Sequence, residues 1–500
     1  MRFSKDTFSP GQQANNENRL TVDLKSNIEK INDFLCNTED LIVTEINKNS
    51  ERLTLLYLDT MVKKDLLFSY VVDPLLKSDS TDLKFLSKLE INRSSRISTL
   101  GKRLVDGYCV IIKENCTDGF MIEVSDSIGR SISEPNSEQN INGAHDGFIE
   151  SISTNIQFLR KRVRNTDFKV EYFTIGKMTN TKVAMVYLDS LANRMLVEEV
   201  MKRISSIQID QLQSTGNLEE LIEDNPYSPF PQVLNTERPD RATSYLLDGK
   251  IALIVDGSPM VSIVPITFFS FYQAPDDYNH RWLIGSFFRI IRVFSFIVAI
   301  SLPAIYIAIV TFHSEVLPIG ILYSIRVSLE FVPFLPLVEA LAMQIILELL
   351  KEASIRLPSP IAQTIGIVGG LVIGTAVVEA HLVSNTMIVV IGFTAIASFV
   401  APINEMGTSA RLLGFPTMIA ASVFGFFGII LSLMLIFMHL SKLQSFGIPY
   451  FSPIAPFKKE DLKDTFIRLP FWKLNTRPTD AKPKKLRQQG LSRVWKKNDH

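Results

Sequence analysis

The stretch LPSPIAQTIGIVGGLVIGTAVVEAHLVSNTMIVVIGFTAIASFVAP, from Leu357 to Pro402, determines the fold class of this chain. Its first apolar run carries small residues at a strict spacing of four: Ala362, Gly366, Gly370 and Gly374. On a helix this spacing leaves one edge almost without side chains, so that another helix can come close, within or between subunits. A short turn with His381 and Asn385 leads into a second apolar run. The stretch therefore predicts a helical hairpin in a membrane.

Five apolar runs, two of which form this hairpin, are candidate membrane segments. They are Val293–Phe312, Pro333–Leu350, Ile361–Val378, Met387–Ile403 and Leu412–Leu440. Basic residues mark the cytoplasmic side of a membrane protein, and they occur both before the first run and in the tail, so an even number of crossings is required. Two solutions stay open. Either the last run divides at Gly425 or Gly428 so that it contains a re-entrant piece, or Leu317–Leu329 forms a short extra span despite Arg326.

Two phrases of the N-terminal region occur twice, in the same order. Tyr57-Leu58-Asp59 returns as Tyr187-Leu188-Asp189, and Leu104-Val105-Asp106-Gly107 returns as Leu246-Leu247-Asp248-Gly249. The second phrase of each copy opens a predicted β-hairpin, with Asp118-Gly119 or Asp256-Gly257 in its turn. We therefore predict a duplication: two α+β subdomains, each a small mixed sheet with helices on one side.

The predicted fold class is an α+β soluble N-terminal region followed by an all-α polytopic membrane domain. Its parts are a disordered head with a short helix (1–37), the first subdomain (38–131), a linker helix (132–164), the second subdomain (165–280), the membrane domain (281–445) and a basic cytoplasmic tail (446–500). The linker helix ends in basic residues, which suits either packing between the subdomains or contact with a partner or an anionic lipid surface. No apolar stretch lies near Met1, so we expect no cleaved signal peptide and a cytoplasmic N-terminal region.

Glu339 is the one ionisable residue near the middle of an apolar run. A carboxylate is costly there, which makes Glu339 a candidate for an ion path or gate; a hydrogen-bonded packing role is the alternative. Pro333 and Pro336 precede it and favour a kink, because proline lacks a backbone donor. We therefore group Glu339, Pro333 and Pro336 as candidates for a pore or gate.

The sequence carries no motif of a catalytic class. It has no GxxxxGK[ST], HExxH or GxSxG phrase, its six histidines are scattered, and its three cysteines form no CxxC pair. We expect no enzyme activity, no cofactor and no metal site. From Lys458 onward the tail has thirteen Lys and Arg against five Asp and Glu. After an apolar span, such a tail indicates a topology signal that lies on membrane lipid rather than a contact with nucleic acid.

Several long phrases resemble, in order, the A subunit of the spore germination receptors, the GerA family of endospore-forming bacteria. They include ISEPNSEQNINGAHDGFIESISTNIQFLRKRVRN, YLLDGKIALIVDGSPMVSIVP, FYQAPDDYNHRW and the stretch from FLPLVEALAMQ to IASFVAP, and the resemblance covers Thr38 to about Ser452. Near Ala144 the chain departs from the family, which usually has a basic residue there.

The resemblance implies a multi-pass subunit of a nutrient germinant receptor in the spore inner membrane. It implies partners, a transporter-like B subunit and a lipoprotein C subunit, and homo-oligomers that provide an ion-conducting path. Two other classes remain open from the residues alone. A secondary transporter would bind its substrate at broken helices in the membrane, and a non-conducting scaffold would only anchor partners.

Overall fold

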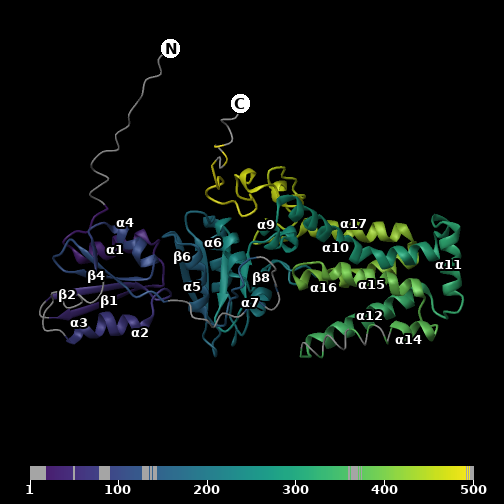
Figure 1. Cartoon of the computed structure of the whole chain (residues 1–500), viewed down its shortest axis with the longest axis horizontal. Helices are drawn as coiled ribbons and strands as arrows, with labels where there is room; N and C mark the ends of the chain where they lie inside the picture. Colours follow the sequence, from purple (N-terminus) through teal and green to yellow (C-terminus); the bar gives the residue numbers. More distant parts are fainter. Residues whose placement is uncertain are drawn as a thin grey trace, which may run out of the picture.

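The computed structural model describes residues 18–48, 51–77, 91–126, 134–135, 138, 143–358, 361, 367, 370, 372, 374–490, 493 and 495. Two α/β units and a helical half follow one another along the long axis of the molecule (Figure 1). The C-terminal tail lies over the second unit and the start of the helical half. The division into an α+β N-terminal region and a helical C-terminal half is therefore confirmed.

The first unit is built on an antiparallel sheet with the strand order β1-β2-β4-β5-β3. Its strands are β1 (Leu41–Lys48), β2 (Glu51–Leu58), β3 (Asn92–Ser94), β4 (Tyr108–Lys113) and β5 (Gly119–Glu123). Helices α1 (Leu24–Phe34) and α4 (Ile97–Val105) share one hydrophobic core with this sheet. On its other face, α2 (Lys64–Leu67), the π-helical turn Phe68–Val72 and α3 (Asp73–Lys77) enclose a second core.

The second unit repeats this plan, with the strand order β6-β7-β9-β10-β8. Its strands are β6 (Phe168–Ile175), β7 (Thr181–Leu188), β8 (Leu234–Thr236), β9 (Ile251–Val255) and β10 (Val261–Val264). Helices α5 (Ile152–Arg162) and α8 (Pro239–Leu247) cover one face, and α6 (Arg194–Ser205) and α7 (Thr215–Ile222) cover the other. Two sheets with one strand order are what a duplicated chain would form.

Both sheets differ in two respects from the mixed, one-sided sheets predicted above. All their strand pairs are antiparallel, and helices cover both faces. Alternate residues of β9 show the reason. Leu253 packs into the core under α6, whereas Ala252 and Ile254 pack into the core under α5 and α8. A strand buried on both faces reads as a continuous apolar run, and IALIV has no polar position. Helix α5 stands before β6 as α1 stands before β1, so the predicted linker helix opens the second copy.

A buried ion pair joins the two units. Arg160, at the end of α5, donates from Nε to Oδ2 of Asp40 (2.8 Å) and from Nη2 to Oδ1 (2.6 Å). The exposed fraction of Arg160 is 0% and that of Asp40 is 1%. Backbone contacts run beside this pair, since Glu39 N donates to the carbonyl of Val170 (3.0 Å). Of the two roles left open for the basic helix end, these contacts support packing between the units.

The helical half consists of long helices that run along the molecule, with one short helix across the far end (Figure 1). The described helices are α10 (Trp282–Thr311), α11 (Ile319–Leu329), α12 (Pro336–Ile355), α14 (Gly374–Glu379), α15 (Asn385–Phe399), α16 (Asn404–Phe424) and α17 (Phe426–Lys442). The break between α16 and α17 lies at Gly425, whose φ is 59°. Helix α11 has 11 residues, about 16 Å, which is too short to cross a bilayer. The structure therefore favours the division at Gly425 over the extra span.

Within the described ranges, α10 is the one helix both long and apolar enough to cross a membrane. Helices α11, α15 and α17 are apolar but shorter than 18 residues, and α12 carries charges such as Glu348 and Lys351. That all five apolar runs cross the membrane thus remains a prediction. Both ends of the helical half meet at the second unit: α10 follows α9 (Asp276–Asn279), and after α17 the backbone N–H of Phe268 donates to the carbonyl of Tyr450 (2.8 Å). This agrees with an even number of passes.

The described part of the tail packs against the rest of the protein. Its short pieces are β11 (Gln444–Ser445), β12 (Ile448–Pro449) and the 3-10 turns Asp461–Asp464 and Phe471–Lys473. Arg477 donates to the carbonyl of Leu247 (2.6 Å), and Lys484 to that of Asp189 (2.6 Å). Arg477 and Lys484 thus bind the second unit, a role that the count of charges does not predict.

Candidate functional site

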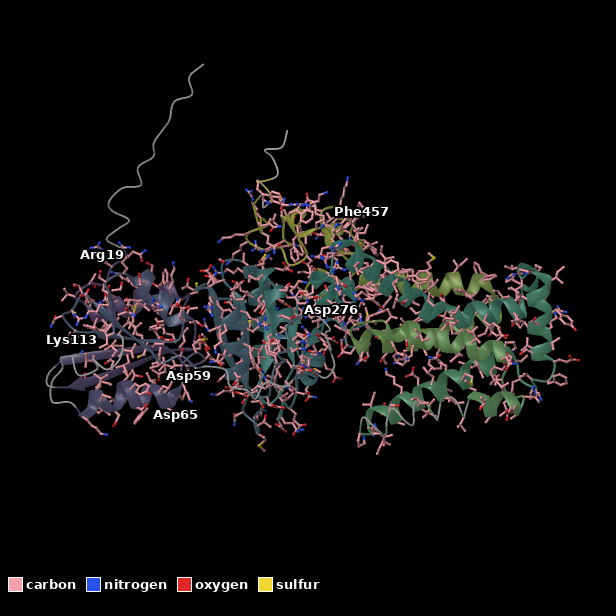
Figure 2. All side chains as sticks on the ribbon, viewed as in Figure 1. Arg19, Asp59, Asp65, Lys113, Asp276 and Phe457 are labelled. Atoms are coloured by element: carbon pink, nitrogen blue, oxygen red, sulfur yellow. The ribbon has the colours of Figure 1, made fainter. Side chains whose placement is uncertain are left out.

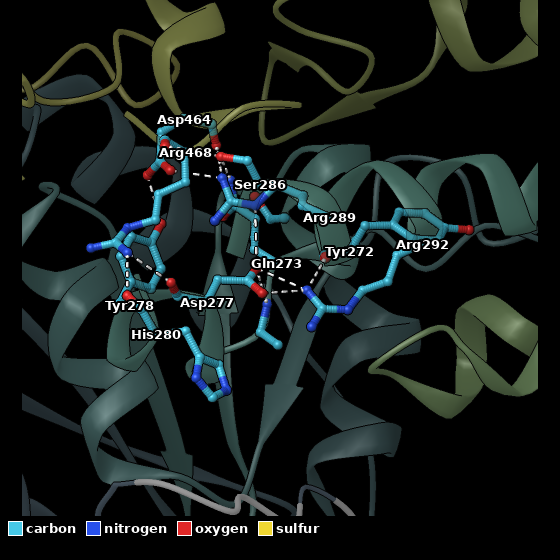
Figure 3. A network of polar contacts seen from close by, with 12 residues as sticks. Tyr272, Gln273, Asp277, Tyr278, His280, Ser286, Arg289, Arg292, Asp464 and Arg468 are labelled. Carbon is cyan, nitrogen blue, oxygen red and sulfur yellow. Dashed lines mark hydrogen bonds and ion pairs between the residues drawn. The ribbon is translucent and has the colours of Figure 1, made fainter. Parts of the chain in front are cut away.

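A cluster of charged residues lies where the second unit, α10 and the tail meet (Figure 3). We call it the junction cluster. Its members are Asp277 and Tyr278 from α9, Arg289 and Arg292 from α10, and Asp464 and Arg468 from the tail. Figure 3 shows these side chains pointing toward one another from three separate segments of chain. The cluster thus ties the α/β region, the first long helix and the C-terminal tail into one unit.

Asp277 is the centre of the cluster. Arg292 Nη1 donates to both of its carboxylate oxygens (2.6 and 2.8 Å), and Arg289 Nε donates to Oδ2 (3.2 Å). Asp277 is almost fully buried, and Arg289 is fully buried. Breaking the ion pairs between this buried carboxylate and the two guanidinium groups is costly, because a buried charge that loses its partner is not solvated by water. The geometry therefore fixes the angle at which α10 leaves the second unit.

Asp464 brings the tail into the cluster. It accepts from Arg289 Nη1 (2.7 Å) and from the hydroxyl of Tyr278 (2.6 Å). Burial raises the pKa of the Tyr278 phenol well above its usual value, and the charge of Asp464 adds to this, so Tyr278 stays a hydrogen-bond donor. Arg468 donates to the carbonyls of Asp277 (2.9 Å) and His280 (3.0 Å). Within the described residues, Arg289 Nη2 and Arg468 Nε are buried without a partner.

Sequence reasoning missed this cluster. The sequence pattern assigns the arginines before Val293 only to the cytoplasmic side of a membrane. Asp277 offered a local signal, since it lies 15 and 12 residues before Arg292 and Arg289. Asp464 is 175 residues from Arg289, and no local pattern links the two.

Glu339 lies near the middle of its apolar run but in the first turn of α12. The cause is the late start of α12, at Pro336. The carboxylate is buried, with 1% of the residue exposed, and its Oε2 accepts from the backbone N–H of Ser384 (2.9 Å). Ser384 Oγ lies 3.2 Å from the hydroxyl of Tyr306 on α10. Oε1 is buried without a partner among the described residues, so the carboxylate has capacity for a further ligand.

Pro333 and Pro336 do not kink a helix. Pro336 is the first residue of α12, a position where the missing N–H costs nothing, and Pro333 lies before that helix. Their effect is to set where α12 begins, and hence to place Glu339 in its first turn. The helix N-terminus carries a partial positive charge that favours a carboxylate there.

The predicted glycine edge makes no contact inside the chain where it is described. Ala362 and Gly366 lie outside the described residues. A Cβ added to Gly370 or Gly374 would meet no described atom within 4 Å. Close helix contacts occur elsewhere: a Cβ on Gly428 would lie 2.1 Å from the carbonyl oxygen of Ala420, and one on Gly407 would lie 2.4 Å from that of Ser398. Among the described residues, Gly370 and Gly374 therefore have no close contact within the same chain.

The helical half also differs from the α/β units in its surface. Figure 2 shows side-chain nitrogen and oxygen atoms all over the units and the tail, whereas the sticks on the helical half are mostly carbon. Large exposed apolar side chains are frequent on every long helix there, for example Phe287, Leu349, Phe393, Ile419 and Phe427. No group of three or more described His, Cys, Asp or Glu residues could hold a metal ion.

These features define a class of protein: a duplicated α/β region fixed by a buried charged junction to an apolar helical half. The chain belongs to the GerA family, since the model described as Bacillus/Clostridium GerA spore germination protein matches residues 29–480. The resemblance inferred from the sequence is therefore confirmed.

Relatives agree with this assignment. Spore germination protein A1 of Bacillus subtilis (strain 168) is 41% identical over 367 residues, which cover 73% of this chain and 76% of that protein. Spore germination protein KA of the same strain is 36% identical over 482 residues, covering 94% and 89%. Uncharacterized membrane protein YfkQ, also of that strain, is 37% identical over 475 residues and covers 93% of both chains.

One solved structure is similar to the N-terminal part. It is the N-terminal domain of the A subunit of the Bacillus megaterium spore germinant receptor GerK3, with 26% sequence identity and a TM-score of 0.40. The match covers 50% of this chain and 97% of that one.

Proposed function

We propose that this chain is the A-type subunit of a nutrient germinant receptor and that copies of it form a ligand-gated path for monovalent cations in the spore inner membrane. The observation that carries the receptor role is membership of the GerA family, together with relatives named as spore germination proteins. Acting with it would be a transporter-like B subunit and a lipoprotein C subunit. We propose no enzyme activity.

The surface of the helical half supports its insertion in a membrane. Soluble monomers rarely expose large continuous apolar areas, and here every long helix carries exposed Phe, Leu or Ile side chains. Lipid and neighbouring copies of the chain would cover them. In this arrangement the α/β units and the tail lie together on the cytoplasmic side, since both ends of the helical half meet at the second unit.

The junction cluster supports coupling between the two halves. A shift of the second unit would move Asp277, and Asp277 holds Arg289 and Arg292 of α10. Because α10 packs along α15 and α16, its tilt would be passed on to the rest of the helical half. Packed helices have a few discrete arrangements rather than a continuum, so such a shift can open or close a path.

Glu339 is the proposed cation-facing group. Its second carboxylate oxygen has no described partner, and a carboxylate ring favours cations. Glu339→Gln keeps the volume and the bond from Ser384, so we expect normal abundance but cation release slowed about tenfold, as removal of about 1.4 kcal/mol of stabilisation would cause. Glu339→Leu should also slow release and impair assembly. Potassium release and subunit level, measured together after nutrient addition, test this.

The matched control is Glu315→Gln, which removes an exposed carboxylate from the turn between α10 and α11 and should change nothing. If Glu339 only packs, Gln is silent and Leu lowers abundance. Normal release at normal abundance in Glu339→Gln would remove Glu339 from the path. Planar-bilayer conductance of the purified chain tests the channel itself; concentrative uptake without conductance would indicate a transporter, and neither would indicate a scaffold.

A further inference from the structure

A cavity of about 360 Å³ lies between the second unit and the tail. One wall is the end of α8, a second is the segment from Phe269 to Asn279, and the third is the tail from Glu460 to Gln489. Its volume is in the range of small-molecule sites, which begins at about 300 Å³. Six acidic and four basic side chains line it, so its charge favours a cation.

Three of the four basic side chains that line the cavity are already bound within the protein. Lys250 Nζ pairs with Asp480 (2.9 Å) and lies 4.8 Å from the centre of the Tyr245 ring. Arg477 is held by the carbonyl of Leu247 (2.6 Å), and Arg241 by the carbonyls of Ser270 and Gln273 (both 3.1 Å). These cations are therefore held within the protein and are not offered to an anionic ligand.

Asp248 is different. It is the C-cap of α8, and its carboxylate lines the cavity but forms no hydrogen bond with the described part of the chain. Tyr245 and Tyr278 also line the cavity. A half-buried carboxylate beside aromatic rings is the usual recognition chemistry for an alkylammonium group, which gains from both charge and ring.

We propose that this cavity binds a small organic molecule with a protonated primary amine, with Asp248 as counter-ion and Tyr245 and Tyr278 as apolar walls. Tyr278 and Asp464 belong to both the cavity and the junction cluster. A bound amine would therefore hold the tail against the second unit beside the start of α10. This inference does not depend on the cation path proposed above.

Protonation of Asp248 gives the site a predictable pH dependence. Burial raises the pKa of Asp248 to about 7; the charges of Asp480 and Asp464 act in the same direction, and Lys250 and Arg477 oppose it. An ammonium group needs the ionised carboxylate. Binding should therefore be about tenfold weaker near pH 6 than near pH 8, because the proton competes for the same group.

The test is calorimetric titration of the full detergent-purified chain with butylamine hydrochloride, and with 1-butanol as a neutral probe of similar size. We expect saturable butylamine binding that weakens toward pH 6 and at least a tenfold loss in Asp248→Asn. The duplication supplies a control: Asp106 caps α4 with nearly the same backbone angles but faces solvent, so Asp106→Asn should bind as the wild type does.

Melting curves of both variants show whether they are folded, and the pH profile of the wild type tests Asp248 without any substitution. The inference is overturned if butylamine shows no saturable binding, if binding is the same near pH 6 and pH 8, if 1-butanol binds equally well, or if folded Asp248→Asn retains the wild-type affinity.

Discussion

Arg160 and Asp40 show how much a single buried pair matters at the boundary between the units. Thr38 and Thr60 also donate to Asp40 (2.6 and 2.7 Å), so its carboxylate is fully satisfied. Arg160→Met would leave that carboxylate buried without a countercharge, at a cost of about 3–5 kcal/mol. We expect a correspondingly lower midpoint when urea unfolding of the purified chain is followed by circular dichroism. Arg194→Met, which breaks the exposed pair with Glu198, should cost at most about 0.5 kcal/mol; equal effects of the two variants would contradict this.

Glu219 makes stability depend on pH. Burial, then the charge of Glu405, raises the pKa of Glu219 to about 9, although Asn235 donates a hydrogen bond that opposes this. Because the folded state holds the proton more tightly than the unfolded state, this contribution to stability is complete below about pH 4 and is lost as the pH rises through about 9. Glu219→Gln cannot ionise, so melting temperatures of variant and wild type should diverge in favour of the variant as pH rises from about 5 to 9. If the difference between the two melting temperatures stayed constant over this pH range, Glu219 would not hold the proton in the folded state.

At the scale of the elements, glycines decide how closely α16 and α17 pack. Gly428→Ala would push a Cβ against the backbone of Ala420, and overpacking of this kind costs about 1–3 kcal/mol. The melting temperature of the detergent-purified chain should fall. Gly392→Ala, on α15 with no described atom within 4 Å, should leave it unchanged or raise it, since alanine is the better helix former by up to about 1 kcal/mol.

Gly370 offers the complementary case. It has open space around it within the described chain, so Gly370→Leu should leave the melting temperature of a single chain unchanged. If the glycine edge joins copies, as the proposed oligomer requires, the same variant should weaken assembly in cross-linking. Normal assembly in Gly370→Leu would exclude this edge as the contact.

At the scale of the whole molecule, the arrangement predicts topology. The turn with Glu315 lies at the far end of the helical half, whereas Lys485 lies in the tail on the second unit (Figure 1). In intact cells expressing the chain, a membrane-impermeant maleimide should label Glu315→Cys, and should label Lys485→Cys only after permeabilisation. The three native cysteines lie in the first unit and serve as internal controls. Labelling of Lys485→Cys in intact cells would contradict a cytoplasmic position of the tail.

The sequence by itself determined the duplication, the division between the α/β region and the helical half, and the family. Each of these rests on contiguous patterns: the repeated Asp-Gly phrases that close α4 and α8, the long apolar runs, and family phrases in order. Such patterns can be recognised without knowledge of tertiary contacts, because they reflect local backbone conformation and burial. Gly107 and Gly249, for example, both adopt positive φ, 89° and 87°, after equivalent helices.

Only the tertiary structure decided which charges meet. Arg160 finds Asp40 across 120 residues, and Arg289 finds Asp464 across 175, distances over which a sequence pattern carries no pairing information. The partner of Glu339, which is the backbone N–H of Ser384, and the close helix contact at Gly428 were likewise decided by packing. The physical reason is common to all of these: a buried charge or a bare backbone edge needs a partner, and the fold alone specifies which partner lies within reach.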